Sequence, residues 1–128
     1  MKKIIVLSLV GLFLLSGCSH TNDLGLEVAN HLTIYEMEDF NQEITESVIE
    51  IDDEELIEEI VNILNSAHKQ TGSVDIRIPD YRMDLNEDSV FLWLDDNSGT
   101  VMSVEDTETI YSISSKGRRR LIEIIGER

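Results

Sequence analysis

The sequence is poor in the residues that cross-link small domains. Among its 128 residues there are one cysteine, Cys18, and three histidines. A single cysteine cannot form an intrachain disulfide, so the fold must be held together by burial of apolar side chains. The lone proline, Pro79, cannot donate a hydrogen bond to a sheet, and it indicates a strand break, a bulge or an edge.

Recognisable catalytic patterns are also missing. No glycine-rich phosphate loop is present, and Gly99 stands alone in a predicted hairpin. His20 and His31 belong to the polar stretch before the first predicted strand, where we expect no metal site. His68 falls at the end of a predicted helix, where a protonated imidazole is favoured by the helix dipole. We therefore expect no enzymatic activity and no cofactor.

Positive charge is scarce. The chain has 26 acidic residues against 10 Lys and Arg, which gives a net charge of −16, and every acidic residue follows residue 17. Such a chain is repelled by nucleic acid and by anionic lipid headgroups, so no nucleic-acid partner is expected. The acidity serves solubility, and it also attracts divalent cations or a basic partner.

The first eighteen residues have the order of an export signal. Lys2 and Lys3 precede an apolar run at residues 4–15, which is shorter than the ~20 residues that span a bilayer. The run closes with LSGC at residues 15–18, and this ending resembles the lipobox of bacterial lipoproteins. The resemblance implies a signal peptide at residues 1–17 and a diacylglycerol on Cys18, which would make the membrane a partner through that lipid. The alternatives are a secretory signal followed by an unmodified cysteine, and an uncleaved helix.

The remainder has the length of a single domain. Residues 18–30 are polar with little periodicity, and we expect a lipid-anchored tether there. Residues 31–128 are expected to form one domain, since no internal repeat or low-complexity tract divides them.

Two periodicities alternate along this domain. Apolar positions at helical spacing predict an amphipathic helix over about residues 53–68, with Asp52 and Glu55 as an acidic capping box. Ser114 or Ser115 is expected to cap a closing helix that carries Leu121, Ile122 and Ile125. Alternating or β-branched runs predict strands at residues 32–37, 44–51, 74–78, 81–85, 90–94, 100–104 and 109–113, with turns at 39–42 and 95–99.

These elements predict an α+β fold, in which an antiparallel sheet of four or more strands has two helices packed on one face. The nearly all-apolar run VFLWL at residues 90–94 is typical of a central strand. Ile60 and Leu64 lie one turn apart on the apolar stripe of the first helix, and we expect both to be buried. Trp93 and Tyr81 are interpreted as core or edge packing residues, and the alternative is a platform for a ligand.

The second half of the chain carries the pattern of a known family. IPDY at residues 78–81, FLWL at 91–94, GTVM at 99–102 and TIYSISS at 109–115 resemble the YhfM-like domain of small lipoproteins from Bacillus and its relatives. The similarity extends over about residues 44–125. It implies the fold and a Gram-positive host, in which the anchor would lie on the outer face of the plasma membrane. The family is uncharacterised, so the resemblance implies no catalytic residue.

A cluster of cations breaks the acidic pattern near the start of the closing helix, where the helix dipole disfavours positive charge. Its members are Lys116, Arg118, Arg119 and Arg120. The favoured interpretation is pairing with acidic groups of the same domain. The alternative is a binding spot for an anionic wall polymer, a lipid headgroup or an acidic envelope protein.

Asp84, Asn86 and Asp88 occupy positions 1, 3 and 5 of a calcium-loop pattern. Position 6 is Ser89 instead of glycine, and position 12 is Asp95 instead of glutamate. We therefore favour an acidic β-turn and predict no metal site. The carboxylates at residues 52–55, 58 and 59 are interpreted as a solvated helix start.

The sequence as a whole predicts a membrane-anchored, extracytoplasmic lipoprotein with a non-enzymatic binding or interaction domain. Its expected partners are the membrane and, through the domain, an envelope protein or a wall polymer. The alternative function is a divalent-cation-binding envelope module that uses the acidic surface.

Overall fold

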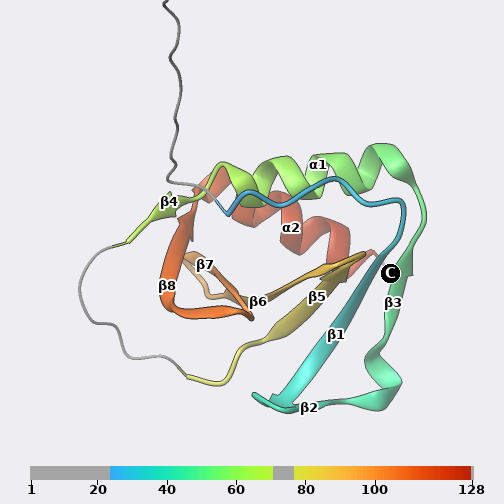
Figure 1. Cartoon of the computed structure of the whole chain (residues 1–128), viewed down its shortest axis with the longest axis horizontal. Coiled ribbons are helices and arrows are strands. Elements are labelled where there is room, and N and C mark those ends of the chain that lie inside the picture. The colour runs from blue at the N-terminus through green and yellow to red at the C-terminus, as the bar shows by residue number, and fades with distance from the viewer. Residues whose placement is uncertain (1–23, 71–76, 128) are drawn as a thin grey trace, which may run out of the picture.

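The computed structural model describes residues 24–70 and 77–127, which form one antiparallel sheet and two α-helices (Figure 1). The strands are β1 (Leu32–Asp39), β2 (Gln42–Glu43), β3 (Ile49–Ile51), β4 (His68–Lys69), β5 (Tyr81–Leu85), β6 (Asp88–Leu94), β7 (Gly99–Ser103) and β8 (Asp106–Ile113). The helices are the 3₁₀ turn η1 (Thr45–Ser47), α1 (Glu54–Asn65) and α2 (Ser115–Gly126). The expected α+β class is confirmed.

The strands lie in the order β2-β1-β5-β6-β7-β8-β4, and β3 pairs with the N-terminal part of β1. Consecutive hairpins connect β5 to β8, while β1 joins them through its register with β5, in which Leu32 lies opposite Leu85. The predicted central position of residues 90–94 is confirmed, since β6 pairs with β5 on one side and with β7 on the other.

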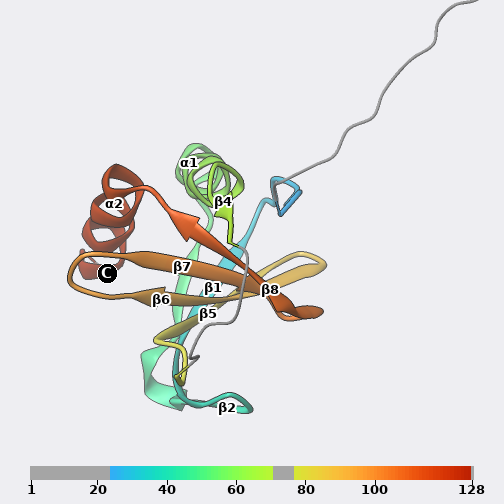
Figure 2. The same cartoon turned by 90° about the vertical axis from the view of Figure 1, so that its left-hand side faces the viewer.

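Strand β6 contributes to hydrophobic clusters on both faces of the sheet. Val90 and Leu92 are fully buried in the main core beneath the helices. Phe91 and Trp93 point to the other face, where they form a smaller cluster with Met37 and Met102. Both helices lie on the side of the main core (Figure 2), as predicted.

Helix α1 buries the expected stripe, in which Ile57, Ile60, Val61 and Leu64 are at most 1% exposed. Its N-cap is Asp53, whose Oδ1 accepts hydrogen bonds from the backbone N–H groups of Glu55 and Leu56. The expectation that Asp52 caps this helix is wrong.

The end of α1 also differs from the prediction, which extended the helix to His68. The helix ends at Asn65, and Ser66 is its C-cap. His68 and Lys69 instead pair with Ser112 and Tyr111 of β8 as the short strand β4. Strand pairing at the edge of the sheet therefore replaces the last predicted helical turn.

The predicted strand at residues 44–51 is interrupted by η1, and only Ile49–Ile51 remain as a strand. Ser47 stabilises the interruption, because its Oγ donates to the carbonyl of Ile44 at 2.6 Å and accepts from the N–H of Glu36 at 2.9 Å. Of the predicted strand at residues 74–78, residues 74–76 lie outside the described residues, and Ile78 precedes β5 without belonging to a strand.

The folded unit begins earlier than the tether expected at residues 18–30 implies. Leu26 and Ala29 are only 8% and 4% exposed, and both belong to the main core. The side chain of Asn65 holds this segment, since its Oδ1 accepts from the N–H of Leu26 and its Nδ2 donates to the Leu26 carbonyl, both at 2.9 Å. Residues 24–30 therefore pack against the end of α1.

Of the two predicted cap residues, Ser114 caps helix α2, through a 3.0 Å hydrogen bond from the N–H of Gly117 to Oγ, and Ser115 is the first residue of the helix. A Cβ at Gly117 would lie 2.8 Å from Cγ2 of Ile63, so glycine allows α2 to approach α1. The helix buries Leu121 and Ile124, whereas Ile122 is 42% exposed. The expectation that Ile122 shares the buried stripe is wrong, because Ile124 takes that place.

The buried stripe of α1 gives a first prediction. Ile60→Ala or Leu64→Ala should lower the free energy of unfolding by about 2–5 kcal/mol, because each removes a fully buried side chain and leaves a cavity. Urea unfolding of the wild type and the variants measures the loss. Val28→Ala, at a 54% exposed position, is the control and should change stability by less than about 0.5 kcal/mol. Losses below about 0.5 kcal/mol for both helix variants would contradict the docking of α1 on the sheet.

A second prediction concerns His31, which contacts Asp52 through Nδ1 and lies 3.3 Å from Glu50 through Nε2. The hydrogen bond to Asp52 is the main cause that raises the pKa of His31 above its ordinary value of 6.5. A raised pKa means that protonated His31 stabilises the fold fully below about pH 6.5 and that this contribution is lost as pH rises through the folded-state pKa.

His31→Gln should therefore be less stable than the wild type near pH 6, and the difference should shrink toward pH 8.5. Urea midpoints of both proteins across this pH range give the measurement. A difference that stays constant with pH would contradict a protonated His31 between the two carboxylates.

Candidate functional site

The four cations predicted near the start of α2 differ in their surroundings. Arg118 and Arg120 contact other residues of the domain, whereas Lys116 and Arg119 are exposed. Arg120 forms a two-pronged contact with Glu59 of α1, with Nε–Oε2 at 2.6 Å and Nη2–Oε1 at 3.1 Å, and its Nη1 donates to Glu123 at 2.8 Å. The hydrogen bond from Arg120 lowers the pKa of Glu59. Arg120 thus connects the two helices.

Arg118 also turns inward, since its Nη1 donates to the backbone carbonyl of Asp95 at 2.9 Å. Lys116 and Arg119 are exposed, and neither forms an ion pair with any residue in the described part of the chain. The structure therefore provides partners within the domain for two of the four predicted site residues. The role of the other two as an anion site stays a prediction.

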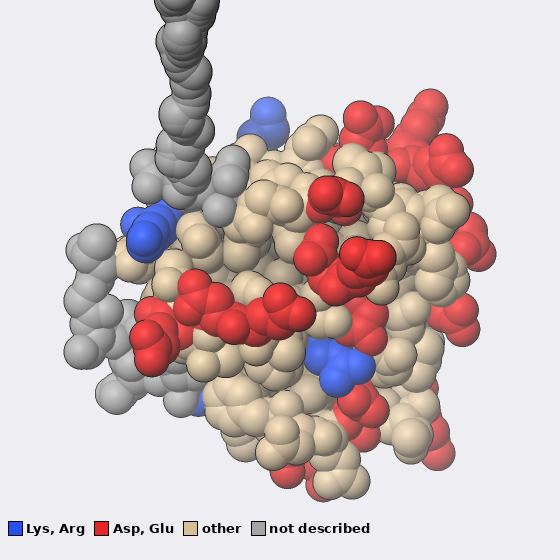
Figure 3. Space-filling model, in the orientation of Figure 1, with Lys and Arg blue, Asp and Glu red and all other residues tan. Residues whose placement is uncertain are grey.

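A hollow of about 470 Å³ separates the start of α2 from α1. Cations and carboxylates share its wall, which includes Glu55, Glu58, Glu59, Lys116 and Arg120. Because the carboxylates outnumber the cations, this hollow does not present a uniform field to an anion. Figure 3 shows acidic side chains over much of the visible face and few Lys or Arg.

The acidic residues of the calcium-like pattern lie in the β5–β6 hairpin. Asp84 is paired, because Arg82 donates to both of its carboxylate oxygens and Ser89 donates to Oδ1 at 2.7 Å. Asn86 lies in the turn, and Asp88 begins β6. Within residues 24–70 and 77–127, no three His, Cys, Asp or Glu side chains are grouped so as to hold a metal ion.

Cys18, the predicted lipid attachment site, lies outside the described residues. Neither α-helix of the described part has the length and apolar character needed to cross a membrane.

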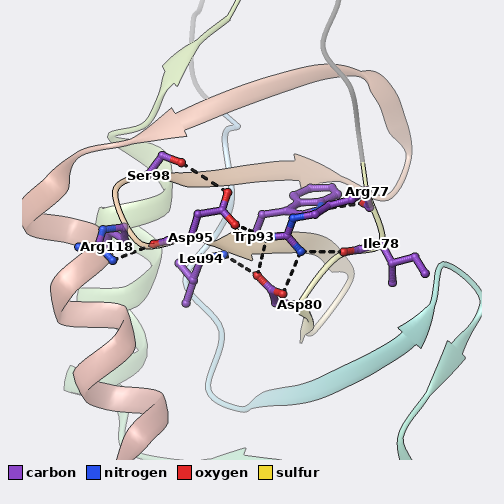
Figure 4. Close-up of polar contacts among 8 residues, drawn as sticks. All are labelled: Arg77, Ile78, Asp80, Trp93, Leu94, Asp95, Ser98 and Arg118. Carbon is purple, nitrogen blue, oxygen red and sulfur yellow. Dashed lines mark hydrogen bonds and ion pairs between the residues drawn. The ribbon is translucent and has the colours of Figure 1, made fainter.

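A polar network connects the motifs IPDY and FLWL to α2 (Figure 4). Arg77 donates to Asp80 at 3.2 Å and also to Asp95, and its own carbonyl accepts from Nε1 of Trp93 at 2.8 Å. Asp80 Oδ2 accepts from the N–H of Leu94 at 2.8 Å. The hydrogen bonds to Asp80 and Asp95 raise the pKa of Arg77. The network fixes the segment before β5 onto the end of β6.

The pairing of Arg77 with Asp95 could not be predicted from the sequence, because the two residues are 18 positions apart and follow no recognised spacing. The interpretation of Trp93 as a packing residue is confirmed, since its side chain is 4% exposed within the smaller cluster. The network is therefore structural, and it positions the surface beside it.

That surface is a groove along the C-terminal half of α2, which we call the α2 groove. It consists of two adjoining hollows of about 590 and 600 Å³, and both are lined by Glu36, Tyr81, Ile125 and Gly126. The first also contains Ile78, Asp80 and Ile122, and the second contains Glu46, Val48 and Glu50.

The side chains that line the α2 groove are of two kinds. Its apolar wall consists of Val48, Ile78, Ile122 and Ile125, and its acidic rim consists of Glu36, Glu46, Glu50 and Asp80. Tyr81 lies at the junction of the two hollows, and burial is the main cause that raises its pKa, with Glu36 and Asp80 adding to the effect. An apolar wall beside carboxylates can bind a ligand that combines apolar and cationic groups. The groove was not predicted from the sequence. The one signal for it was Ile122, an isoleucine of α2 that lies outside the buried stripe of Leu121 and Ile124.

A family model described as YhfM protein matches residues 27–128. No curated protein and no solved structure shows significant similarity to the chain.

The pairing of Arg120 gives a third prediction. Arg120→Gln should lower the urea midpoint because it removes the contact between α2 and Glu59, and added salt should shrink the loss. Arg119→Gln is the matched control, since it removes a neighbouring charge without an ion pair among the described residues. If Arg119→Gln lowers the midpoint as much as Arg120→Gln, the charge of the segment matters and the specific contact does not.

Proposed function

Because the chain belongs to the YhfM family, we propose that it is a lipoprotein held through Cys18 on the outer face of a bacterial plasma membrane, and that its domain is a non-enzymatic binding module. The observation that carries the anchor is the order of the first eighteen residues, in which the sole cysteine ends an apolar run. Two acyl chains on this cysteine are enough for stable attachment.

The folded domain begins only a few residues after Cys18, which would keep an anchored domain close to the bilayer. Leu26 is already held by Asn65, and the described chain begins at Leu24. A fully extended chain from Cys18 to Leu24 reaches at most about 20 Å. The folded part of an anchored domain would therefore begin within about two Debye lengths of the headgroups at physiological salt.

The binding role is supported by the α2 groove, which offers apolar side chains and carboxylates to a partner. The arrangement fits recognition of another molecule, since Arg77 and Asp80 beside it hold each other in place.

The anchor is tested by Cys18→Ala in the full chain, expressed in a Gram-positive bacterium. Wild-type protein should partition into the detergent phase, and its intact mass should correspond to residues 18–128 plus lipid. Cys18→Ala should carry no lipid, and it should either leave the membrane fraction or persist as the unprocessed precursor. Ser19→Ala, which keeps the cysteine, is the control and should behave as the wild type. An unlipidated wild-type chain, or a variant with unchanged mass and partitioning, would refute the anchor.

A further inference from the structure

We propose that the α2 groove binds a basic amphipathic segment of a partner protein. This proposal deepens the binding role proposed above and names the chemistry of the partner. It does not depend on the lipid at Cys18.

Exposed apolar side chains gather at this groove. In the described part of the chain, six large apolar residues are substantially exposed: Val28, Phe40, Ile44, Val48, Ile78 and Ile122. Three of them line the groove, where Val48 is 42%, Ile78 is 45% and Ile122 is 42% exposed. Clustered exposed apolar side chains rimmed by polar groups are typical of an interaction site, whereas scattered ones are ordinary.

The same three residues come from separate parts of the chain. Val48 follows η1, Ile78 precedes β5, and Ile122 lies on α2. The segments of Val48 and Ile78 are fixed by hydrogen bonds of nearby side chains, since Ser47 binds Glu36 and Ile44 while Asp80 binds Leu94 and Arg77. Ile122 is held by the backbone of α2. The wall is therefore preformed, which reduces the entropy cost of binding.

The rim is acidic and only partly neutralised. Arg77 pairs with Asp80, and His31 lies 3.3 Å from Glu50. Glu36 and Glu46 form no ion pair with any residue among 24–70 and 77–127. Two uncompensated carboxylates beside an apolar wall favour a ligand with cationic side chains next to apolar ones.

The net charge of −16 disfavours the other occupants. A second copy of the chain would bring the same acidic rim against this one, and an anionic lipid surface would be repelled in the same way. The groove is also remote from the point where the described chain begins. The blue start of the described chain lies on the side of β4, whereas the C-terminal end of α2 lies at the opposite side of the domain in both views (Figures 1 and 2).

The test uses the full chain in neutral nanodiscs and a short fluorescent peptide of alternating lysine and leucine, with empty nanodiscs as background. Fluorescence anisotropy should show saturable binding. A peptide with glutamate in place of lysine should not bind, and a peptide with serine in place of leucine should bind roughly tenfold more weakly.

Variants locate the site. Ile78→Ser combined with Ile122→Ser should weaken binding of the lysine–leucine peptide roughly tenfold, because the apolar contact is lost. Val28→Ser, at a 54% exposed position outside the groove, should leave binding unchanged. Glu36→Gln combined with Glu46→Gln should weaken binding at low salt and reduce its salt dependence. Urea melts of each variant verify that the domain remains folded.

Several results would overturn the proposal. These are the absence of any peptide binding, equal binding of the serine-containing peptide, and equal loss in Val28→Ser and the groove variant. Dimerisation of the wild type that the groove variant abolishes would assign the surface to a second copy. Cys18→Ala should leave peptide binding unchanged, so failure of the anchor and failure of the groove are distinguishable.

Discussion

The structure depends on the burial of β6 on both of its faces. A strand buried on both faces must have apolar side chains at successive positions, and residues 90–93 meet this requirement as Val, Phe, Leu and Trp. Val90 and Leu92 anchor the core beneath the helices, while Phe91 and Trp93 organise the smaller cluster behind the sheet. Without disulfides, this strand is the element through which the two clusters stabilise each other.

The placement of α2 follows from that strand. The end of β6 leads into Asp95, whose carbonyl accepts from Arg118, while Gly117 lets the helix approach Ile63 of α1. Arg120 adds the contact to Glu59 on the same neighbour. With the N-terminal half of α2 fixed in this way, its C-terminal half forms one wall of the α2 groove.

Features set by local periodicity could be predicted from the sequence. The stripe containing Ile60 and Leu64, the central strand and the Ser114 cap depend on residues within one element, and all three were expected. The break at η1 was not, because Ile44 and Val48 have the composition of a strand yet are 40% and 42% exposed. β-Branched side chains favour an extended backbone, but this preference does not determine whether a neighbouring strand is available for pairing.

The candidate site was harder to predict because it also depends on contacts between elements that are distant in the sequence. Glu59 and Arg120 are 61 residues apart, and no spacing rule connects them. The outward position of Ile122 depends on where the neighbouring elements end, since Leu121 and Ile124 already fill the core. Charge patterning identified the basic segment, whereas the partners of its individual cations are a property of the three-dimensional arrangement.

The position of β1 in the sheet has a consequence for the order of folding. Strands β5 to β8 pair with their neighbours in sequence, so this meander can form from local contacts that close short loops. Strand β1 instead pairs with β5, from which it is separated in sequence by residues 40–80. Strand β3, which pairs with β1, and helix α1 both lie within this intervening segment. As the polypeptide emerges N-terminus first, the apolar faces of β1 and α1 remain uncovered until the C-terminal hairpins are complete. Carboxylates are dense at residues 52–55, 58 and 59, beside the apolar stripe of α1. During this interval their mutual repulsion disfavours association between unfinished chains.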